Sequence, residues 1–153
     1  MTDFSLRTIL VPTDFSVGSL AAVEYALALA SRSGADVVLL HVMEPTVYSV
    51  DFALTHPDIS AGIRQGATES LRQLTEDARS RGVRAEHALA AGTPFVEIGK
   101  VAADRKADLI VMGTHGRTGL AHAVLGSTAE RVVRFAPCPV LTVKAVPPPE
   151  RVP

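Results

Sequence analysis

Three glycines and a serine follow one buried apolar run at a spacing that suits phosphate binding. Gly113 ends the run, Gly116 comes three residues later, and Gly126 stands directly before Ser127. Glycine lets the backbone approach a ligand closely and adopt positive φ, so successive N–H groups can converge on an anion. The start of a helix adds unpaired N–H donors and a partial positive charge. The pattern therefore predicts a phosphate-binding loop, with ordinary turn glycines as the alternative.

Two polar side chains extend this prediction. Arg117 can neutralise the charge of distal phosphates, and Ser127 can offer its hydroxyl to a phosphate. The residues from Ser127 to Glu130 fit a capping box, so a helix is expected to begin at Ser127. Two other phosphate loops do not fit, because the chain has no Gly-x4-Gly-Lys-Ser/Thr and no Gly-x-Gly-x-x-Gly after its first apolar run.

A second polar segment, Pro12 to Ser16, follows the first apolar run. Asp14 is the strongest single candidate in it for a role beyond packing. The alternative is that Asp14 caps the next helix, although Ser16 suits that cap better.

Three further residues keep two interpretations each. His115 lies inside the glycine-rich stretch and either contacts phosphate or faces solvent. His41 interrupts an apolar run, where a histidine is more often a hydrogen-bonded core residue than a ligand. Cys138, the only cysteine, lies between two prolines, and a redox role would need a lowered pKa that no sequence neighbour supplies. The histidines show no metal-ligand spacing, so a zinc site is not expected.

Five apolar runs must position these residues. Four are continuously apolar, as strands covered on both faces should be, and the third alternates like a half-exposed edge strand. The runs are Thr8–Val11, Val37–Val42, Val83–Leu89, Leu109–Met112 and Val140–Val143.

Segments with helical periodicity separate the runs. The first carries Leu20, Val23, Leu27 and Ala30 on one face and ends at Gly34, and the second carries Ile59, Ile63, Ala67, Leu71, Leu74 and Ala78 and ends at Gly82. A third is expected to begin with Thr93 as cap and Pro94 at the first helical position. The fourth begins at Ser127.

This alternation predicts an α/β fold, with one open five-stranded parallel sheet and helices on both faces. Ligands bind such sheets beyond the carboxyl ends of the strands, where the strand order reverses. Only the first and fourth strands end in unusual polar or glycine-rich segments. We therefore expect them to be neighbours in the order 3-2-1-4-5, with residues 1–145 as the single domain and 146–153 as a disordered proline-rich tail.

Composition excludes several classes of protein. The 153 residues carry 15 Lys and Arg against 16 Asp and Glu, and this net charge of −1 argues against binding to nucleic acid. No apolar run approaches the roughly 20 residues of a membrane span, and no signal peptide is apparent, so a soluble cytoplasmic protein without a membrane partner is expected. A single cysteine forms no intramolecular disulfide.

The connection from Met43 to Pro57 is long for a loop and carries Tyr48 and Phe52. Long connections in compact domains are often functional or mobile. Our hypothesis is a flap that partly covers the ligand.

From Thr8 to Val143 the chain resembles the universal stress proteins. The pattern Gly-x2-Gly-x9-Gly-Ser/Thr is typical of the branch of that family that binds ATP, and it is intact here. The resemblance is carried by Ile9–Ser16, Leu39–Val42, Ile110–Gly116, Gly126–Val133 and Ala136–Val140.

The resemblance implies a Rossmann-like, nucleotide-binding alpha hydrolase-like fold and a stress-response protein that binds ATP, with Mg²⁺ possible, and has no well-defined reaction. Asp14 is expected near the ribose or the metal, and Val42 against adenine. The full set of nucleotide-binding residues it implies is Pro12, Thr13, Asp14, Val42, Met112, Gly113, Gly116, Arg117, Gly126, Ser127 and Thr128.

The resemblance also implies a homodimer. The fifth strand (Val140, Leu141, Thr142, Val143) would pair with its twofold copy, which would cover an exposed apolar edge. Two alternatives stay open: a slow ATPase or nucleotide-dependent enzyme that uses Asp14 and Mg²⁺, and a structural dimer that keeps the motif without using it. The choice among ATP, AMP and a cyclic nucleotide also stays open.

Overall fold

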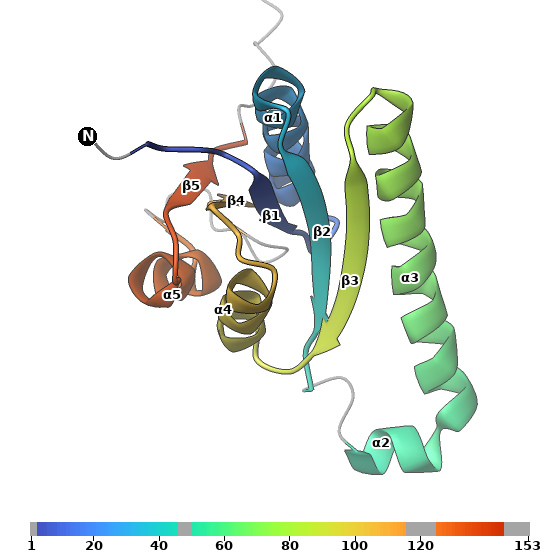
Figure 1. Cartoon of the computed structure of the whole chain (residues 1–153). Coiled ribbons are helices and arrows are strands. Elements are labelled where there is room, and N and C mark those ends of the chain that lie inside the picture. The colour runs from blue at the N-terminus through green and yellow to red at the C-terminus, as the bar shows by residue number, and fades with distance from the viewer. Residues whose placement is uncertain (1–2, 46–49, 116–124, 146–153) are drawn as a thin grey trace, which may run out of the picture.

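A computed structural model describes residues 3–45, 50–115 and 125–145 of the chain. Strands and helices alternate along it (Figure 1). The strands are β1 (Thr8–Pro12), β2 (Asp36–Met43), β3 (Ala85–Ala91), β4 (Leu109–Gly113) and β5 (Val140–Val143). The helices are α1 (Val17–Ser33), α2 (Val50–Thr55), α3 (Pro57–Ser80), α4 (Pro94–Asp104) and α5 (Ser127–Phe135).

The five strands form one sheet in the order β3-β2-β1-β4-β5, and every neighbouring pair is parallel. Ile9 of β1 lies opposite Val37 on one side and Leu109 on the other, so β1 and β4 are neighbours as predicted. The alternating strand β3 is at the edge, which confirms that prediction too. The strand order reverses between β1 and β4, and this junction is where the polar strand ends meet.

The sheet is buried on both faces because successive strand residues point to opposite sides. Val37 and Leu39 belong to the core beneath α1 and α3, whereas Val38 and Leu40 belong to the core beneath α4 and α5. All four are at most 2% exposed. This explains why the β2 segment is continuously apolar.

Helix ends follow the signals expected from the sequence. Ser16 is the N-cap of α1, and its hydroxyl accepts a hydrogen bond from the Ser19 N–H at 3.3 Å. Gly34 ends α1 in the left-handed conformation at φ 75°, and Thr93 and Pro94 begin α4.

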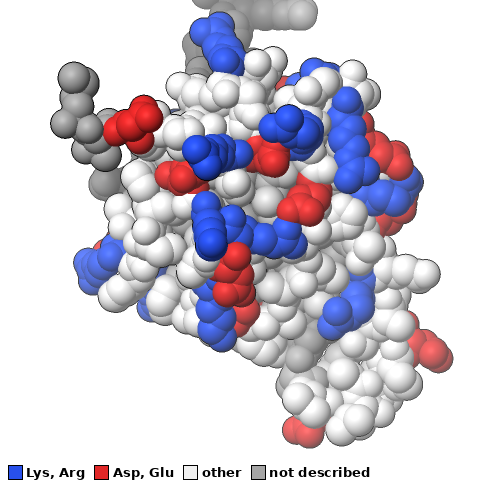
Figure 2. Space-filling model, viewed as in Figure 1, with Lys and Arg blue, Asp and Glu red and all other residues white. Residues whose placement is uncertain are grey.

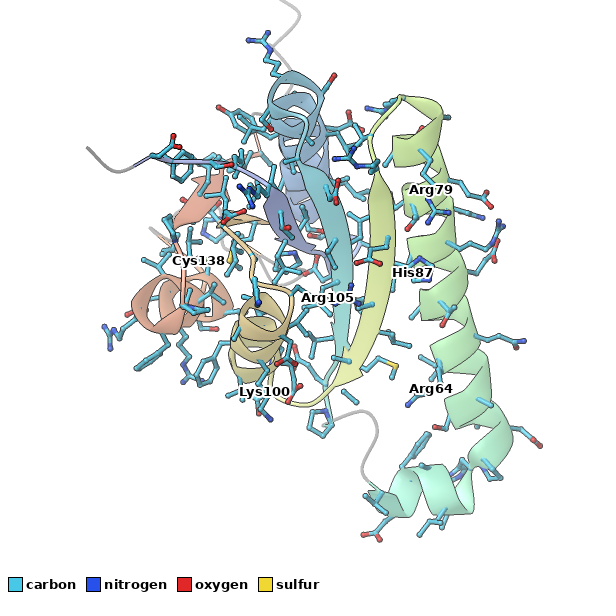
Figure 3. All side chains as sticks on the ribbon, in the orientation of Figure 1. Arg64, Arg79, His87, Lys100, Arg105 and Cys138 are labelled. Carbon is cyan, nitrogen blue, oxygen red and sulfur yellow. The ribbon has the colours of Figure 1, made fainter. Side chains whose placement is uncertain are left out.

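Polar contacts fasten the second half of α3 to the edge strand. His87 Nδ1 lies 3.0 Å from the Thr75 hydroxyl, and Arg79 Nε donates to the Ala85 carbonyl at 2.9 Å. Figure 3 shows Arg79 and His87 in the space between α3 and β3.

The connection after β2 differs from the prediction of a long loop. Residues Val50–Thr55 form α2, and α3 begins at Pro57 rather than near Ile59. The break falls at His56 (φ −133°), because the residue before a proline is disfavoured in the helical conformation. Tyr48 and the predicted tail 146–153 lie outside the described residues.

The first half of α3 is not part of the core. Ile59 and Ile63, predicted on the buried face, are 52% and 37% exposed, and Leu20 of α1 is 36% exposed. The buried residues of α3 are Leu71, Thr75 and Ala78, all in its second half. In Figure 1 the first half of α3, together with α2, extends past the end of β3.

The surface carries charges of both signs side by side (Figure 2). Exposed ion pairs join Arg81 to Glu24 at 2.6 Å and Arg84 to Asp36 at 2.5 Å. The Arg81 guanidinium holds the pKa of Glu24 below its usual value. No helix in the described parts of the chain is long and apolar enough to cross a membrane.

The burial of α3 leads to a prediction on stability. Leu71→Ala, at a fully buried position, should lower the free energy of unfolding by about 2–5 kcal/mol. Ile59→Ala, on the same helix but half exposed, should change it by less than about 1 kcal/mol. Urea denaturation of both variants measures the difference. Equal losses would mean that the first half of α3 packs against something in solution.

Candidate functional site

A cavity of about 1210 Å³ opens at the carboxyl edge of the sheet. The ends of β1, β2 and β4 and the first turns of α1, α4 and α5 line it, and one side of α3 closes it. Its volume lies above the usual 300–1,000 Å³ of a small-molecule site. It occupies the position expected for a ligand in an open parallel sheet.

Most residues predicted for the site line this one cavity. They are Pro12, Thr13, Asp14, Val42, Met112, Gly113, Gly126, Ser127 and Thr128. Gly116 and Arg117 lie outside the described residues. His41 and His115 also line the cavity, whereas α2, in the segment proposed as a flap, does not.

The turn after β1 is held by its own side chains. The buried Thr13 hydroxyl shares a hydrogen bond with the Ser19 hydroxyl at 2.9 Å and accepts one from the Phe15 N–H at 3.0 Å. Asp14 Oδ1 accepts from the Ser16 N–H at 3.0 Å. Phe15 has φ 64°, an uncommon conformation for a residue with a side chain. These bonds hold the strained turn and fix the direction of the Asp14 backbone.

His41 ties this turn to β2. Its Nδ1 lies 2.8 Å from the Thr13 carbonyl oxygen, and because a carbonyl only accepts, Nδ1 carries the proton. Its ring stacks at a tilt on the Phe15 ring, with centroids 4.7 Å apart. The predicted hydrogen bond of His41 is confirmed, but the side chain is half-buried and lines the cavity rather than lying in the core.

The end of β4 packs directly against the backbone of α1. A Cβ added to Gly113 would lie 3.0 Å from the Gly18 carbonyl carbon and oxygen, and one added to Gly18 would lie 3.1 Å from the His115 oxygen. A side chain at either position would push the two segments apart. Sequence reasoning missed Gly18; the signal was a glycine in the first turn of a helix, where it lowers helix propensity.

The start of α5 approaches the β4 loop just as closely. The Gly126 N–H donates to the Thr114 carbonyl at 2.7 Å, and an added Cβ would lie 2.9 Å from that oxygen. Gly126 is the N-cap of α5, and Ser127 is the first helical residue. The predicted capping box at Ser127 was therefore wrong by one residue, because this close contact requires a glycine at the cap.

Charged groups of both signs face the cavity. Asp14 and Glu44 contribute carboxylates, and Arg131 is the one Lys or Arg among the described lining residues. Sequence reasoning missed Arg131, although its position four residues after Ser127 places both on one side of α5. The partial positive charge of the α5 N-terminus adds to the attraction for an anion.

Metal-ligand groups are scarce. Within residues 3–45, 50–115 and 125–145, no three His, Cys, Asp or Glu side chains lie close enough together to hold a metal ion.

Cys138 lies two residues before β5 (Figure 3) and is not among the residues that line the cavity. It is half-buried, and burial together with the nearby Asp108 carboxylate raises the pKa of its thiol. The raised pKa makes the thiolate scarcer, so the structure supplies no activation for redox chemistry.

Comparison with known sequences decides the family. The sequence model of the universal stress protein family matches residues 5–144. The chain belongs to the universal stress protein family. The universal stress protein MJ0531 of Methanocaldococcus jannaschii is 37% identical over 139 residues, which cover 90% of this chain and 82% of that protein.

Solved structures show the same fold. Protein MJ0577 of the same organism has 29% identity and a TM-score of 0.84, covering 95% of this chain and all of the other. A universal stress protein solved in complex with cAMP has 26% identity and a TM-score of 0.70, covering 94% of this chain and all of the other. The Rossmann-like α/β fold with strand order 3-2-1-4-5 is thus established, while the role of each cavity residue stays a prediction.

The close contact at Gly126 predicts that a side chain there lowers the free energy of unfolding, whereas a side chain at a glycine with open space around it does not. Gly126→Ala should lower the free energy of unfolding by about 1–3 kcal/mol, because its Cβ would overlap a backbone oxygen. Gly99→Ala, in the interior of α4 with open space around it, should be neutral or stabilising by up to about 1 kcal/mol. Thermal unfolding of both variants compares them. A harmless Gly126→Ala would contradict the close approach.

Proposed function

We propose that this universal stress protein binds an adenine nucleotide, ATP with Mg²⁺ foremost, in the cavity at the carboxyl edge of the sheet. The observation that carries the proposal is that the close contact at Gly126 holds the first turn of α5 (Ser127, Thr128 and Ala129) against the cavity beside the end of β4. The N–H groups of a first helical turn have no acceptor within the helix, and they bind phosphate without any net charge on the protein. The relative in complex with cAMP supports an adenine nucleotide as ligand.

Each end of the cavity suits one part of the nucleotide. Thr128 and Ser127, in the first turn of α5, face the phosphates together with the β4 loop. Val42, near the end of β2, faces the adenine, and Pro12 lines the same cavity from the end of β1. In this proposal the nucleotide lies across the β1–β4 junction.

Asp14 suits a magnesium ion brought in by the nucleotide. Mg²⁺ in proteins is usually bound by one or two carboxylates together with substrate phosphates and water. One carboxylate fits that pattern, whereas a resident metal site would need more ligands than the described residues bring together.

We also propose that the nucleotide-binding unit is a cytoplasmic homodimer in a stress response, joined through β5. Strand β5 is an edge of the sheet and pairs with β4 alone. The N–H of Ile110 in β4 donates to the Pro139 carbonyl at 3.0 Å, and the N–H of Thr114, the residue after β4, donates to the Val143 carbonyl at 3.2 Å. Since backbone groups alternate in direction along a strand, Thr142 presents its N–H and carbonyl to the open side. An open edge of this kind is a template for pairing with a second copy.

Calorimetric titration with ATP and Mg²⁺ tests the nucleotide proposal. The protein, first shown to be free of co-purified nucleotide, should bind ATP in a saturable one-to-one manner, and hydrolysis can be assayed on the same samples. The absence of any heat beyond dilution would refute nucleotide binding.

Substitution at Asp14 tests whether this carboxylate affects ATP binding through the metal ion or through the phosphates. Asp14→Asn keeps an oxygen that can accept from the Ser16 N–H, but it removes the charge. ATP affinity should fall severalfold with Mg²⁺ and stay equal or rise in EDTA, where a carboxylate only repels phosphate. Asp104→Asn, at the far end of α4, is the control and should change neither value. An equal change with and without Mg²⁺ would argue against Asp14 as a metal ligand.

Substitution in β5 tests the dimer. Thr142→Pro removes an outward N–H and no hydrogen bond to β4, so it should convert a dimer into a folded monomer. Sedimentation velocity measures the mass, and circular dichroism checks the fold. A folded Thr142→Pro variant that remains dimeric would place the interface elsewhere.

A further inference from the structure

Arg131 occupies an unusual position for a charged side chain of this protein. It lines the cavity from α5, and its guanidinium carbon lies 5.2 Å from the centre of the Phe95 ring of α4. Several arginines on the surface are paired with carboxylates, as Arg72, Arg81 and Arg105 are. Within the described part of the chain, Arg131 has no carboxylate at ion-pair distance. Among the described residues, no carboxylate therefore neutralises its charge.

The helix places Arg131 beside the proposed phosphate site. Positions three and four apart lie on one side of a helix, so Arg131 stands one turn beyond Thr128 and Ser127 on the side of α5 that faces the cavity. The backbone donors end with the first turn of the helix. A phosphate chain that extends past those donors next meets this guanidinium.

The aromatic ring beneath the guanidinium restricts where it can go. Phe95 is half-buried and packs against the core beneath α4 and α5, and its ring lies 5.9 Å from that of Phe135. A ring fixed in this way attracts a guanidinium to its face while leaving the N–H groups at the edge of the guanidinium free to donate. This contact thus orients the planar set of N–H donors of the guanidinium, which matches the spacing of phosphate oxygens.

Resting on the proposed nucleotide function, we propose that Arg131 is a specificity residue that contacts the distal phosphates, and that Phe95 positions it. Arg131 distinguishes a nucleoside polyphosphate from a nucleoside or monophosphate in the same cavity. The backbone N–H groups in the first turn of α5 do not distinguish a monophosphate from a polyphosphate, because donors next to the first phosphate serve AMP, ADP and ATP alike.

The test is a calorimetric series with ATP, ADP, AMP and adenosine on the full-length chain. Arg131→Gln should lower the affinity for ATP about tenfold, lower the affinity for ADP by less, and leave the affinity for adenosine unchanged. The reason is that only the distal phosphates lose a charged hydrogen bond. Arg131→Lys should lower the affinity for ATP by less than Arg131→Gln, because lysine keeps the positive charge but lacks the planar set of guanidinium donors.

Two further variants sharpen the series. Arg134→Gln, three residues further along α5, is the matched control; Arg134 pairs with Glu130 at 3.3 Å and does not line the cavity. It should leave all four affinities unchanged. Phe95→Leu keeps an apolar side chain but removes the ring, and it should weaken ATP by less than Arg131→Gln while sparing adenosine.

The outcomes separate the two proposals. If the wild-type protein binds none of the four ligands, the nucleotide function fails and the role of Arg131 falls with it. If the wild type binds ATP but Arg131→Gln behaves like Arg134→Gln, the role of Arg131 alone is refuted. An equal loss for ATP and adenosine would likewise refute it, because the substitution would then act on the nucleoside or on the fold.

Discussion

The site depends on backbone lying directly against backbone. At the end of β4, Gly113 leaves no room for a side chain against Gly18, and Gly126 meets the Thr114 carbonyl in the same way. These two contacts bring the first turns of α1 and α5 onto one loop. A side chain at either position would push these segments apart, so the first turns of α1 and α5 would no longer meet at the end of β4.

The sheet supports this contact and was predictable for a physical reason. Burial on both faces requires consecutive apolar residues, as in Val37 to Leu40, and exposure at an edge requires alternation, as in Ala85 to Leu89. Because these patterns follow from burial alone, the layer arrangement and the edge position of β3 could be inferred from the chain. The unusual residues at the ends of β1 and β4 then identified the junction between them.

The predictions for α2 and for the first half of α3 were wrong because a periodic pattern does not tell how far a helix extends beyond the sheet or where it is interrupted. Helix α3 has 24 residues and spans about 36 Å, whereas the seven residues of β3 span about 23 Å. The helix therefore extends past the sheet, so Ile59 keeps the apolar spacing but is 52% exposed, and Ile63 lines the cavity instead of packing in the core. Helix α2 was missed because its six residues are too few to show a period, and Pro57 concealed the boundary between two helices.

Contacts within the site were the least predictable part, because they join residues distant in sequence. The bond from His41 to the Thr13 carbonyl spans 28 residues, and the stack of Arg131 on Phe95 depends on how α4 and α5 pack. The motif residues could be found because backbone geometry demands glycine locally. The difference between backbone and side-chain contacts has a functional consequence. Backbone donors recognise any phosphate, so side chains have to distinguish a polyphosphate from a monophosphate. Asp14 and Arg131, opposite in charge and lining one cavity, are accordingly the residues through which selectivity would arise.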